Sequence, residues 1–172
     1  EGISAVRELA KRIIEIEEMT KDSLTFSCNN LASSKWVNCV PSYASADCLS
    51  MAKTQEDLDE GVECLLKMSG LRNGVNFKIK RGVTRPVWEP NLSGTLDLYE
   101  KARAISEEIG LEMPHRSQGG GSDANFTGSL DIPSLCSLGV KGAGLHTLEE
   151  YIYEDSIVPR TQILAGLLST LE

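Results

Sequence analysis

The sequence predicts an α/β protein in two parts, an α+β half over residues 1–90 and an α/β half over residues 91–172. In both halves, apolar residues recur at the three-to-four-residue spacing of amphipathic helices. Between these helical segments, runs of alternating apolar and polar residues are typical of half-buried strands. A break containing Pro86, Pro90 and Asn91 separates the halves, because these residue types favour turns and end regular structure.

The first half begins with a predicted helix over residues 1–20. Its apolar face is expected at positions that share helical spacing, namely Ile3, Val6, Ala10 and Ile13, with Leu9 and Ile14 beside them. Residues 23–30 and 36–52 then alternate small, polar and apolar side chains, and a short polar turn joins them. This pattern predicts a β-hairpin.

A second helix is expected after the hairpin. Thr54 is a suitable N-cap, Asp57 lies in the first turn, and Gly70 is the expected stop. Residues 75–83 alternate again and predict one more strand. The order helix, strand, strand, helix, strand is that of a ferredoxin-like βαββαβ unit that lacks its first strand.

The second half is expected to start with a helix over residues 95–109 that Gly110 ends. Another helix start is predicted at Ser122, and residues 132–138 have the composition of a short buried strand. A last helix is expected over about residues 156–171. The order helix, helix, strand, helix indicates part of an α/β layer with few strands of its own.

Composition excludes several classes of function. A chain of 172 residues is one large domain or two small ones, and it is long enough to bury a core. The net charge of −8 argues against a nucleic-acid partner, since phosphate binding needs clustered Lys and Arg. No apolar run approaches the roughly 20 residues of a membrane span, so no membrane partner is expected.

The five cysteines are Cys28, Cys39, Cys48, Cys64 and Cys136. They contain no CxxC pair, so a structural zinc knuckle is not expected. An odd number of cysteines in a chain with an ordinary core favours free, buried thiols in a reducing compartment. The sequence therefore predicts a cytoplasmic location.

The chain begins with Glu1 rather than methionine and enters a helical pattern at once. Two explanations fit this start equally well. The sequence is either a piece of a longer chain, or a chain whose start was removed by processing or with a tag.

Two glycine-rich segments near the end of the chain are the strongest functional signals. Gly142 and Gly144 precede His146, one of only two histidines. Glycine allows close backbone approach or positive φ, and an imidazole placed there is either a metal ligand or a hydrogen-bonded structural side chain. The other histidine is His115, and no HxH or HExxH spacing is present. A zinc site needs three or four protein ligands, so the chain supplies no obvious complete site.

The other glycine segment contains Gly119, Gly120 and Gly121. Followed by a helix start, it indicates either an anion-binding backbone or a tight turn capped by Ser122 or Asp123. Arg85 stands near the predicted boundary and is either a bidentate carboxylate clamp or a surface ion-pair partner. Asn38, expected inside an apolar strand, either binds a ligand or faces solvent on an edge strand.

Taken in order, these segments resemble the C-terminal third of the co-catalytic zinc peptidases that include glutamate carboxypeptidase, acetylornithine deacetylase, succinyl-diaminopimelate desuccinylase and aminoacylase. The matching motifs, over about residues 115–165, are Gly119–Thr127, Asp131–Pro133, Gly142–Thr147, Glu150-Tyr151 and Asp155–Arg160. Residues 1–90 resemble the inserted lid, or dimerisation, domain of that family more weakly. The motifs there are Gly2–Val6, Val37–Pro41, Thr54–Asp57 and Thr84–Pro86. The glutamate carboxypeptidase branch is the most similar.

The resemblance implies roles for several residues. His146 would be the last zinc ligand, Asn38 and Arg85 would contact the substrate carboxylate, and the backbone of residues 119–121 would line the substrate site. In the family, two zinc ions polarise the scissile carbonyl and activate a water, and a glutamate acts as general base. A small peptide or N-acyl amino acid is the implied substrate, and a homodimer through the lid is the implied assembly.

This chain also departs from the family pattern. The HxD ligand motif, the bridging Asp, the Glu-Glu pair and the next acidic ligand all precede the lid in the family and are not in this sequence. Met51 stands where an Arg is expected and Leu49 where an Asp is expected, and Ser33-Ser34 replaces a glycine pair. We therefore expect this chain alone to be inactive. The alternatives are a non-catalytic dimerisation or interaction module, and a pseudo-enzyme that binds carboxylates through Arg85 and Asn38.

Overall fold

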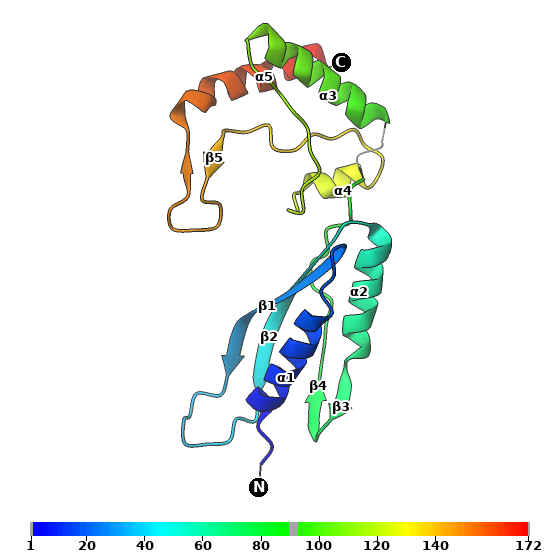
Figure 1. The fold of residues 1–172 in the computed structure, drawn as a ribbon, viewed down its shortest axis with the longest axis vertical. Coiled ribbons are helices and arrows are strands. Elements are labelled where there is room, and N and C mark those ends of the chain that lie inside the picture. The colour runs from blue at the N-terminus through cyan, green and yellow to red at the C-terminus, as the bar shows by residue number, and fades with distance from the viewer. Residues whose placement is uncertain (1, 90–92, 172) are drawn as a thin grey trace. The chain divides into compact units, whose positions relative to one another are not determined.

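The computed structural model describes residues 2–89 and 93–171. The chain divides into two compact units, residues 1–87 and residues 88–172 (Figure 1). Both units combine helices with small antiparallel sheets. The predicted mixture of helices and strands is confirmed, and with antiparallel sheets both units are of the α+β kind that was predicted for residues 1–90.

The first unit has the predicted order of helix, strand, strand, helix and strand, with one short strand added before the last. Its elements are α1 (Ala5–Glu18), β1 (Leu24–Ser33), β2 (Ala44–Ala52), α2 (Gln55–Lys67), β3 (Gly70–Arg72) and β4 (Val75–Phe77). β1 and β2 form one antiparallel hairpin, and β3 and β4 form another.

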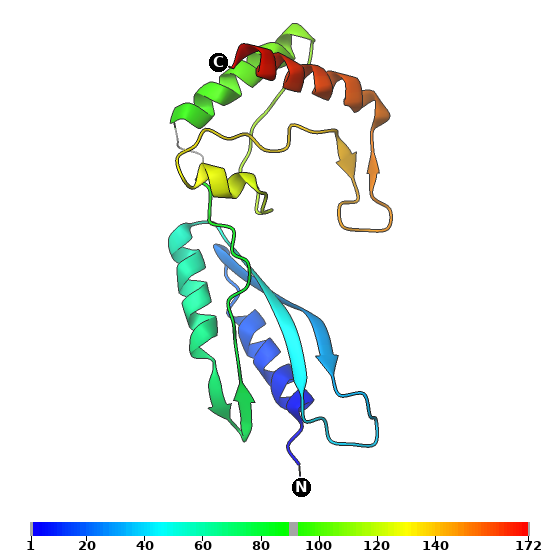
Figure 2. The ribbon, with the colours of Figure 1, turned by 180° about the vertical axis from the view of Figure 1, so that it is seen from behind.

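The core of the first unit lies between the β1–β2 hairpin and the helices α1 and α2, which run alongside it in both views (Figures 1 and 2). Ile16 of α1 packs with Leu24 and Phe26 of β1. Half-buried side chains close around this cluster, namely Met19, Cys28, Ala52, Leu65 and Met68. The other face of the hairpin carries exposed side chains, including Leu49 and Met51.

The buried face of α1 differs from the predicted one. Val6 and Ile14 are 41% and 57% exposed, whereas Glu8 and Arg12 are buried. The reason is that α1 also packs against the β3–β4 hairpin through polar contacts. The Asn73 amide donates to Glu8 at 2.9 Å, and the Arg12 guanidinium lies over the Phe77 ring, 4.8 Å from its centroid.

Helix α2 begins as predicted, since the Asp57 N–H donates to the Thr54 hydroxyl at 3.1 Å. It ends at Lys67, earlier than the predicted stop at Gly70. Two predicted strands are shorter than expected. Residues 34–43 form a loop before β2, and residues 78–89 continue from β4 without regular structure. Alternation alone does not make a strand, because each strand needs a hydrogen-bonded neighbour.

The second unit contains two long helices, a short helix and a short hairpin. Its elements are α3 (Ser93–Glu108), α4 (Ala124–Gly128), β5 (Gly142–Ala143), β6 (Tyr151–Ile152), η1 (Glu154–Ser156) and α5 (Ile157–Thr170). The strand predicted at 132–138 is not formed. These residues follow an irregular path instead, and Leu135 and Leu138 pack against the core formed by α3 and α5.

The core of the second unit lies where α3 meets α5. Ala102 is fully buried, Ile163 is 1% exposed and Leu167 is 5% exposed. Gly166 allows this approach, because a Cβ there would lie 2.8 Å from Cγ2 of Ile105. Gly110 ends α3 as predicted: its φ is +74°, and the next N–H donates to the Ser106 carbonyl at 2.9 Å.

All five cysteines are free, as predicted, but the prediction that they are buried is wrong. Cys28 and Cys64 are half-buried, and the other three are exposed. The exposed ones lie outside both cores: Cys48 on β2, Cys39 in the loop of residues 34–43 and Cys136 in the irregular segment of residues 132–138. Among residues 2–89 and 93–171, no helix is both long enough and apolar enough to cross a bilayer.

Candidate functional site

His146 lies in the turn of the β5–β6 hairpin. The strands pair Gly142 with Ile152 and Ala143 with Tyr151. A Cβ on Gly142 would lie only 2.4 Å from the Tyr151 carbonyl oxygen. Gly144 has φ +73°, and a Cβ there would lie 2.7 Å from the carbonyl oxygen of Glu149. The hairpin itself therefore requires both glycines.

Hydrogen bonds within the turn fix its backbone. The Thr147 hydroxyl donates to the Gly144 carbonyl at 2.7 Å, and it accepts from the Glu149 N–H at 3.1 Å. The His146 N–H donates to Oε2 of Glu150 at 3.4 Å. Hydrogen bonds of the turn backbone and of neighbouring side chains thus hold His146 in place, and its imidazole ring takes no part in them.

The His146 backbone is left-handed, with φ +65°. For a residue that carries a Cβ, this conformation costs about 1–2 kcal/mol, and such strained residues cluster at functional sites. The side chain itself is exposed. An exposed imidazole on a fixed turn can coordinate a metal ion or exchange a proton.

A zinc ion needs three or four protein ligands. Within the part of the chain that the structure describes, no group of three or more His, Cys, Asp and Glu side chains could hold a metal ion. The described residues therefore do not complete a zinc site. The nearby Glu150 carboxylate is already engaged by the His146 backbone.

The glycine segment of residues 119–121 is exposed and has no regular structure. A Cβ on Gly119 or Gly120 would meet no atom within 4 Å, and neither has a left-handed φ. The local fold thus gives no reason for glycine at these two positions, in contrast to Gly142 and Gly144.

The helix start predicted after this segment is present. The Ser122 N–H donates to Oδ1 of Asn125 at 2.8 Å, and the Ser122 hydroxyl accepts from the Ala124 N–H at 3.2 Å. The helix that follows, α4, has only 5 residues, so its dipole offers little to an anion. Ser122 also hydrogen-bonds the thiol of Cys136, which lowers the pKa of that thiol.

Asn38 is not in a strand, contrary to the prediction. It lies exposed in the loop of residues 34–43, where Trp36 is 74% exposed and Val37 is fully exposed. The reason is that β2 begins only at Ala44, so no ladder extends to this position. Arg85 is exposed on the extended segment of residues 78–89.

The predicted site residues therefore come from both units. Asn38 and Arg85 belong to separate segments of the first unit, and residues 119–121 and His146 belong to separate segments of the second. Two of the positions that depart from the family pattern, Leu49 and Met51, are exposed on β2, opposite Ser27 and Thr25 of β1.

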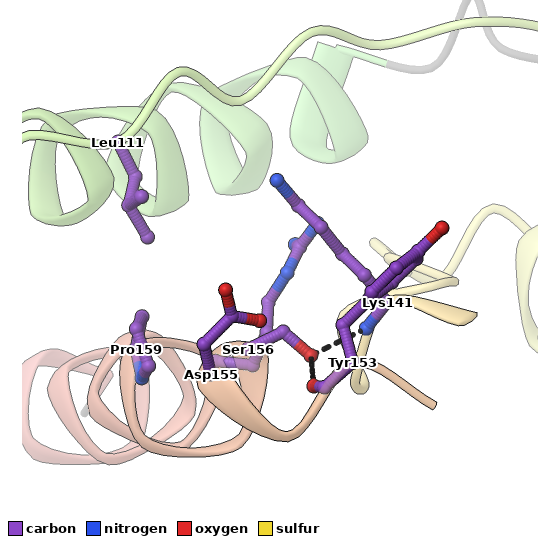
Figure 3. A pocket seen from close by; sticks show the side chains of 7 residues that line it. Leu111, Lys141, Tyr153, Asp155, Ser156 and Pro159 are labelled. Atoms are coloured by element: carbon purple, nitrogen blue, oxygen red, sulfur yellow. Dashed lines mark hydrogen bonds between the residues drawn. The ribbon is translucent and has the colours of Figure 1, made fainter. Parts of the chain in front are cut away.

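A cavity of about 240 Å³ lies at the base of the β5–β6 hairpin (Figure 3). It is lined by Leu111, Lys141, Tyr153, Asp155, Ser156, Pro159 and Arg160. Ser156 joins the two sides of the hairpin base, because its hydroxyl accepts from the Lys141 N–H at 2.9 Å and donates to the Tyr153 carbonyl at 2.6 Å. This cavity could not be predicted from the sequence, since its lining residues meet only when the hairpin folds back onto α5.

Two tyrosines lie side by side on the same hairpin. The hydroxyls of Tyr151 and Tyr153 are 3.1 Å apart, and their rings meet edge to face with centroids 5.3 Å apart. The hydrogen bond to Tyr151 raises the pKa of Tyr153. This pair lies on the outgoing side of the hairpin that carries His146.

Comparison with known proteins gives consistent matches along nearly the whole chain. The model of peptidase family M20/M25/M40 matches residues 4–170. Carboxypeptidase G2 from Pseudomonas sp. (strain RS-16) is 27% identical over 174 residues, which covers 97% of this chain and 41% of the relative. The crystal structure of aminopeptidase PepT from Bacillus cereus ATCC 10987 has a similar fold, with a TM-score of 0.64 at 19% identity over 96% of this chain and 45% of that one. The chain thus spans less than half the length of either protein.

Proposed function

Because this chain belongs to peptidase family M20/M25/M40, we propose that it forms the lid domain and the C-terminal part of the catalytic domain of a zinc-dependent exopeptidase or amidohydrolase. In this proposal, residues 1–90 are the lid and residues 91–172 belong to the catalytic domain. The reaction is hydrolysis of an amide bond next to a free carboxylate. The substrate is a small peptide with a C-terminal glutamate, or an N-acyl amino acid.

The observation that carries the proposal is the backbone of His146. A left-handed φ of +65° at a histidine, on a hairpin with sterically required glycines, supports a role that depends on where the imidazole is held. We assign it as one ligand of a two-zinc centre. Bound zinc would polarise the scissile carbonyl and lower the pKa of a bound water.

The chain's own residues would then bind and orient the substrate. Arg85 would hold the substrate carboxylate through its planar guanidinium, and the Asn38 amide would donate a further hydrogen bond. The open space beside Gly119 and Gly120 supports close approach of substrate to the backbone there. Since the described residues complete no zinc site, we propose that the 172-residue chain alone is inactive.

Hydrolysis tests this function. The assay uses a protein in which these residues are joined to a segment that supplies the remaining ligands, with N-acyl-glutamate and its α-carboxamide as substrates. The acid is expected to be cleaved and the carboxamide spared, and His146→Ala should abolish cleavage without changing the circular dichroism spectrum. Cleavage that survives His146→Ala would refute the assignment.

The second proposed role is dimerisation through the lid, as a homodimer. Apolar side chains exposed on the first unit favour it, notably Leu31, Trp36, Val37, Val40, Leu49 and Met51. Light scattering tests this role, and a strictly monomeric chain at high concentration would contradict it.

A cytoplasmic location is proposed from the five free cysteines, since a reducing compartment keeps such thiols unpaired.

A further inference from the structure

Cys28 and Cys48 face one another across the β1–β2 hairpin. The register pairs Leu24 with Ala52, Phe26 with Ser50 and Cys28 with Cys48. Because side chains alternate along a strand, both cysteines project from the face that packs on the helices. The side chains of Cys28 and Cys48 are therefore neighbours on the same face of the hairpin, and their backbones lie opposite one another.

The hydrogen bonds of β1 show which kind of pair this is. The N–H groups of Phe26 and Cys28 point away from β2, because they donate to the Thr20 hydroxyl at 3.0 Å and to Oε1 of Glu17 at 2.8 Å. The pairs at Phe26 and Cys28 are thus non-hydrogen-bonded pairs, in which Cα atoms are about 4.5 Å apart. A disulfide spans Cα separations of roughly 4.4–6.8 Å, so the backbone already suits one.

The two thiols are also within reach of each other and of solvent. Cys48 is exposed and Cys28 is half-buried, and both are free. Burial, together with the neighbouring Cys48, raises the pKa of Cys28 to about 12. Burial also raises the pKa of Cys48. The register therefore places the two thiols opposite one another, and the Cys48 thiol donates to the carbonyl of its neighbour Leu49 at 3.8 Å.

We propose that Cys28 and Cys48 are a redox-sensitive pair that closes to a cross-strand disulfide in the presence of a small-molecule disulfide oxidant. Cys48, the exposed member, loses its proton to solvent and attacks one sulfur of the oxidant, whose other half leaves as a thiolate. The Cys28 sulfur, losing its proton in turn, attacks the Cys48 sulfur and releases the second thiolate. Two cysteine thiols are oxidised, and one oxidant disulfide is reduced to two thiols.

The disulfide would link the two strands of the hairpin close to the point where their regular pairing is interrupted. The register shifts between Asn29 and Ala32, next to the cysteine pair. The segment that the disulfide would close runs from residue 28 to residue 48 and contains the exposed loop with Asn38. This inference rests on the strand register, the hydrogen bonds of β1 and the exposure of Cys48, so it does not depend on the proposed hydrolase function.

The test uses the full chain with Cys39, Cys64 and Cys136 changed to Ser, so that only the pair remains. The protein is treated with oxidised glutathione and then with an alkylating reagent. Peptide mapping by mass spectrometry is expected to show the Cys28 peptide linked to the Cys48 peptide. The intact protein should carry no alkyl group and should be about 2 Da lighter than the reduced, unalkylated protein, because two hydrogen atoms are lost. Dithiothreitol should restore both alkylatable thiols.

The control is Cys28→Ser in the same background, in which Cys48 is expected to stop at a mixed disulfide with glutathione. The proposal is overturned if both cysteines of the pair variant remain alkylatable, or if each carries its own glutathione with no link between them. Circular dichroism of both variants establishes that the hairpin is folded in each.

Discussion

The glycines of the two functional segments differ in what surrounds them. Gly142 and Gly144 face backbone oxygens at distances that no Cβ tolerates, whereas Gly119 and Gly120 face open space. The first pair is therefore explained by the hairpin that holds His146. The second pair is unexplained by the fold of this chain, which is why we place substrate beside it.

Gly142→Ala is expected to destabilise the second unit by about 1–3 kcal/mol, because the new methyl group would force Tyr151 and its strand away. Gly119→Ala is the matched control and should change the free energy of unfolding by less than about 0.5 kcal/mol. Urea unfolding measures both. Equal effects would contradict the steric account of the hairpin.

Some single residues could be predicted from the sequence and others could not. The Thr54 cap and the Gly110 stop were predicted because each depends on hydrogen bonds within a few residues. The candidate ligand His146 was found from its flanking glycines. Burial of Glu8 and Arg12 was missed, since their partners Asn73 and Phe77 lie more than fifty residues away along the chain.

At the scale of elements, polar contacts attach α1 to the β3–β4 hairpin. Arg72 forms a bidentate pair with Glu15, at 2.5 and 2.7 Å, and Glu8 accepts from Lys11 at 2.8 Å and from Asn73 at 2.9 Å. The bonds from Lys11 and Asn73 lower the pKa of Glu8 from 4.5 to about 2. Contacts of this kind make the docking of α1 sensitive to acid.

A depressed carboxyl pKa in the folded state stabilises the fold above the unfolded pKa, and the contribution is lost as the pH falls toward the folded pKa. For Glu8 the window runs from about pH 4.5 down to about pH 2. Glu8→Gln should therefore lower the free energy of unfolding at neutral pH. As the pH falls through this window, the free energy of unfolding of the variant should decrease less than that of the wild type. Denaturant unfolding at several pH values measures it, and identical pH slopes for the two proteins would count against the role of Glu8.

The contact of α3 with α5 gives a second prediction for elements. Ile163→Ala should cost about 2–5 kcal/mol, because it empties a fully enclosed position beside Ala102 and Leu167. Leu168→Ala, on the exposed face of the same helix, should change stability by less than about 0.5 kcal/mol. Thermal unfolding distinguishes them, and a similar loss in both variants would contradict the packing described for α5.

Helices were predicted better than strands for a physical reason. The periodicity of α2, α3 and α5 is local, so it is visible in one segment. A strand forms only where a neighbouring strand offers a ladder of hydrogen bonds, and residues 34–43 and 132–138 pair with no strand in the described structure. The short strands β5 and β6 were not predicted, because two residues in each strand are too few to show alternation.

At the scale of the whole molecule, the chain joins two compact units with separate cores, and one family model spans both. Sequence motifs could predict the family, since their order and residue types survive at 27% identity. They could not predict a complete site, because only one of the implied zinc ligands is in this sequence. The central claim is therefore that His146 contributes to a metal centre that this chain does not complete.

The zinc content of the purified 172-residue chain tests that claim most directly. The measurement is plasma mass spectrometry after dialysis against zinc-free buffer, on the wild type and on His146→Ala. We predict well under one zinc ion per chain, with any residual zinc removed by the substitution. Two zinc ions retained per chain would contradict the account, because the described residues would then hold a complete centre without the partners it requires.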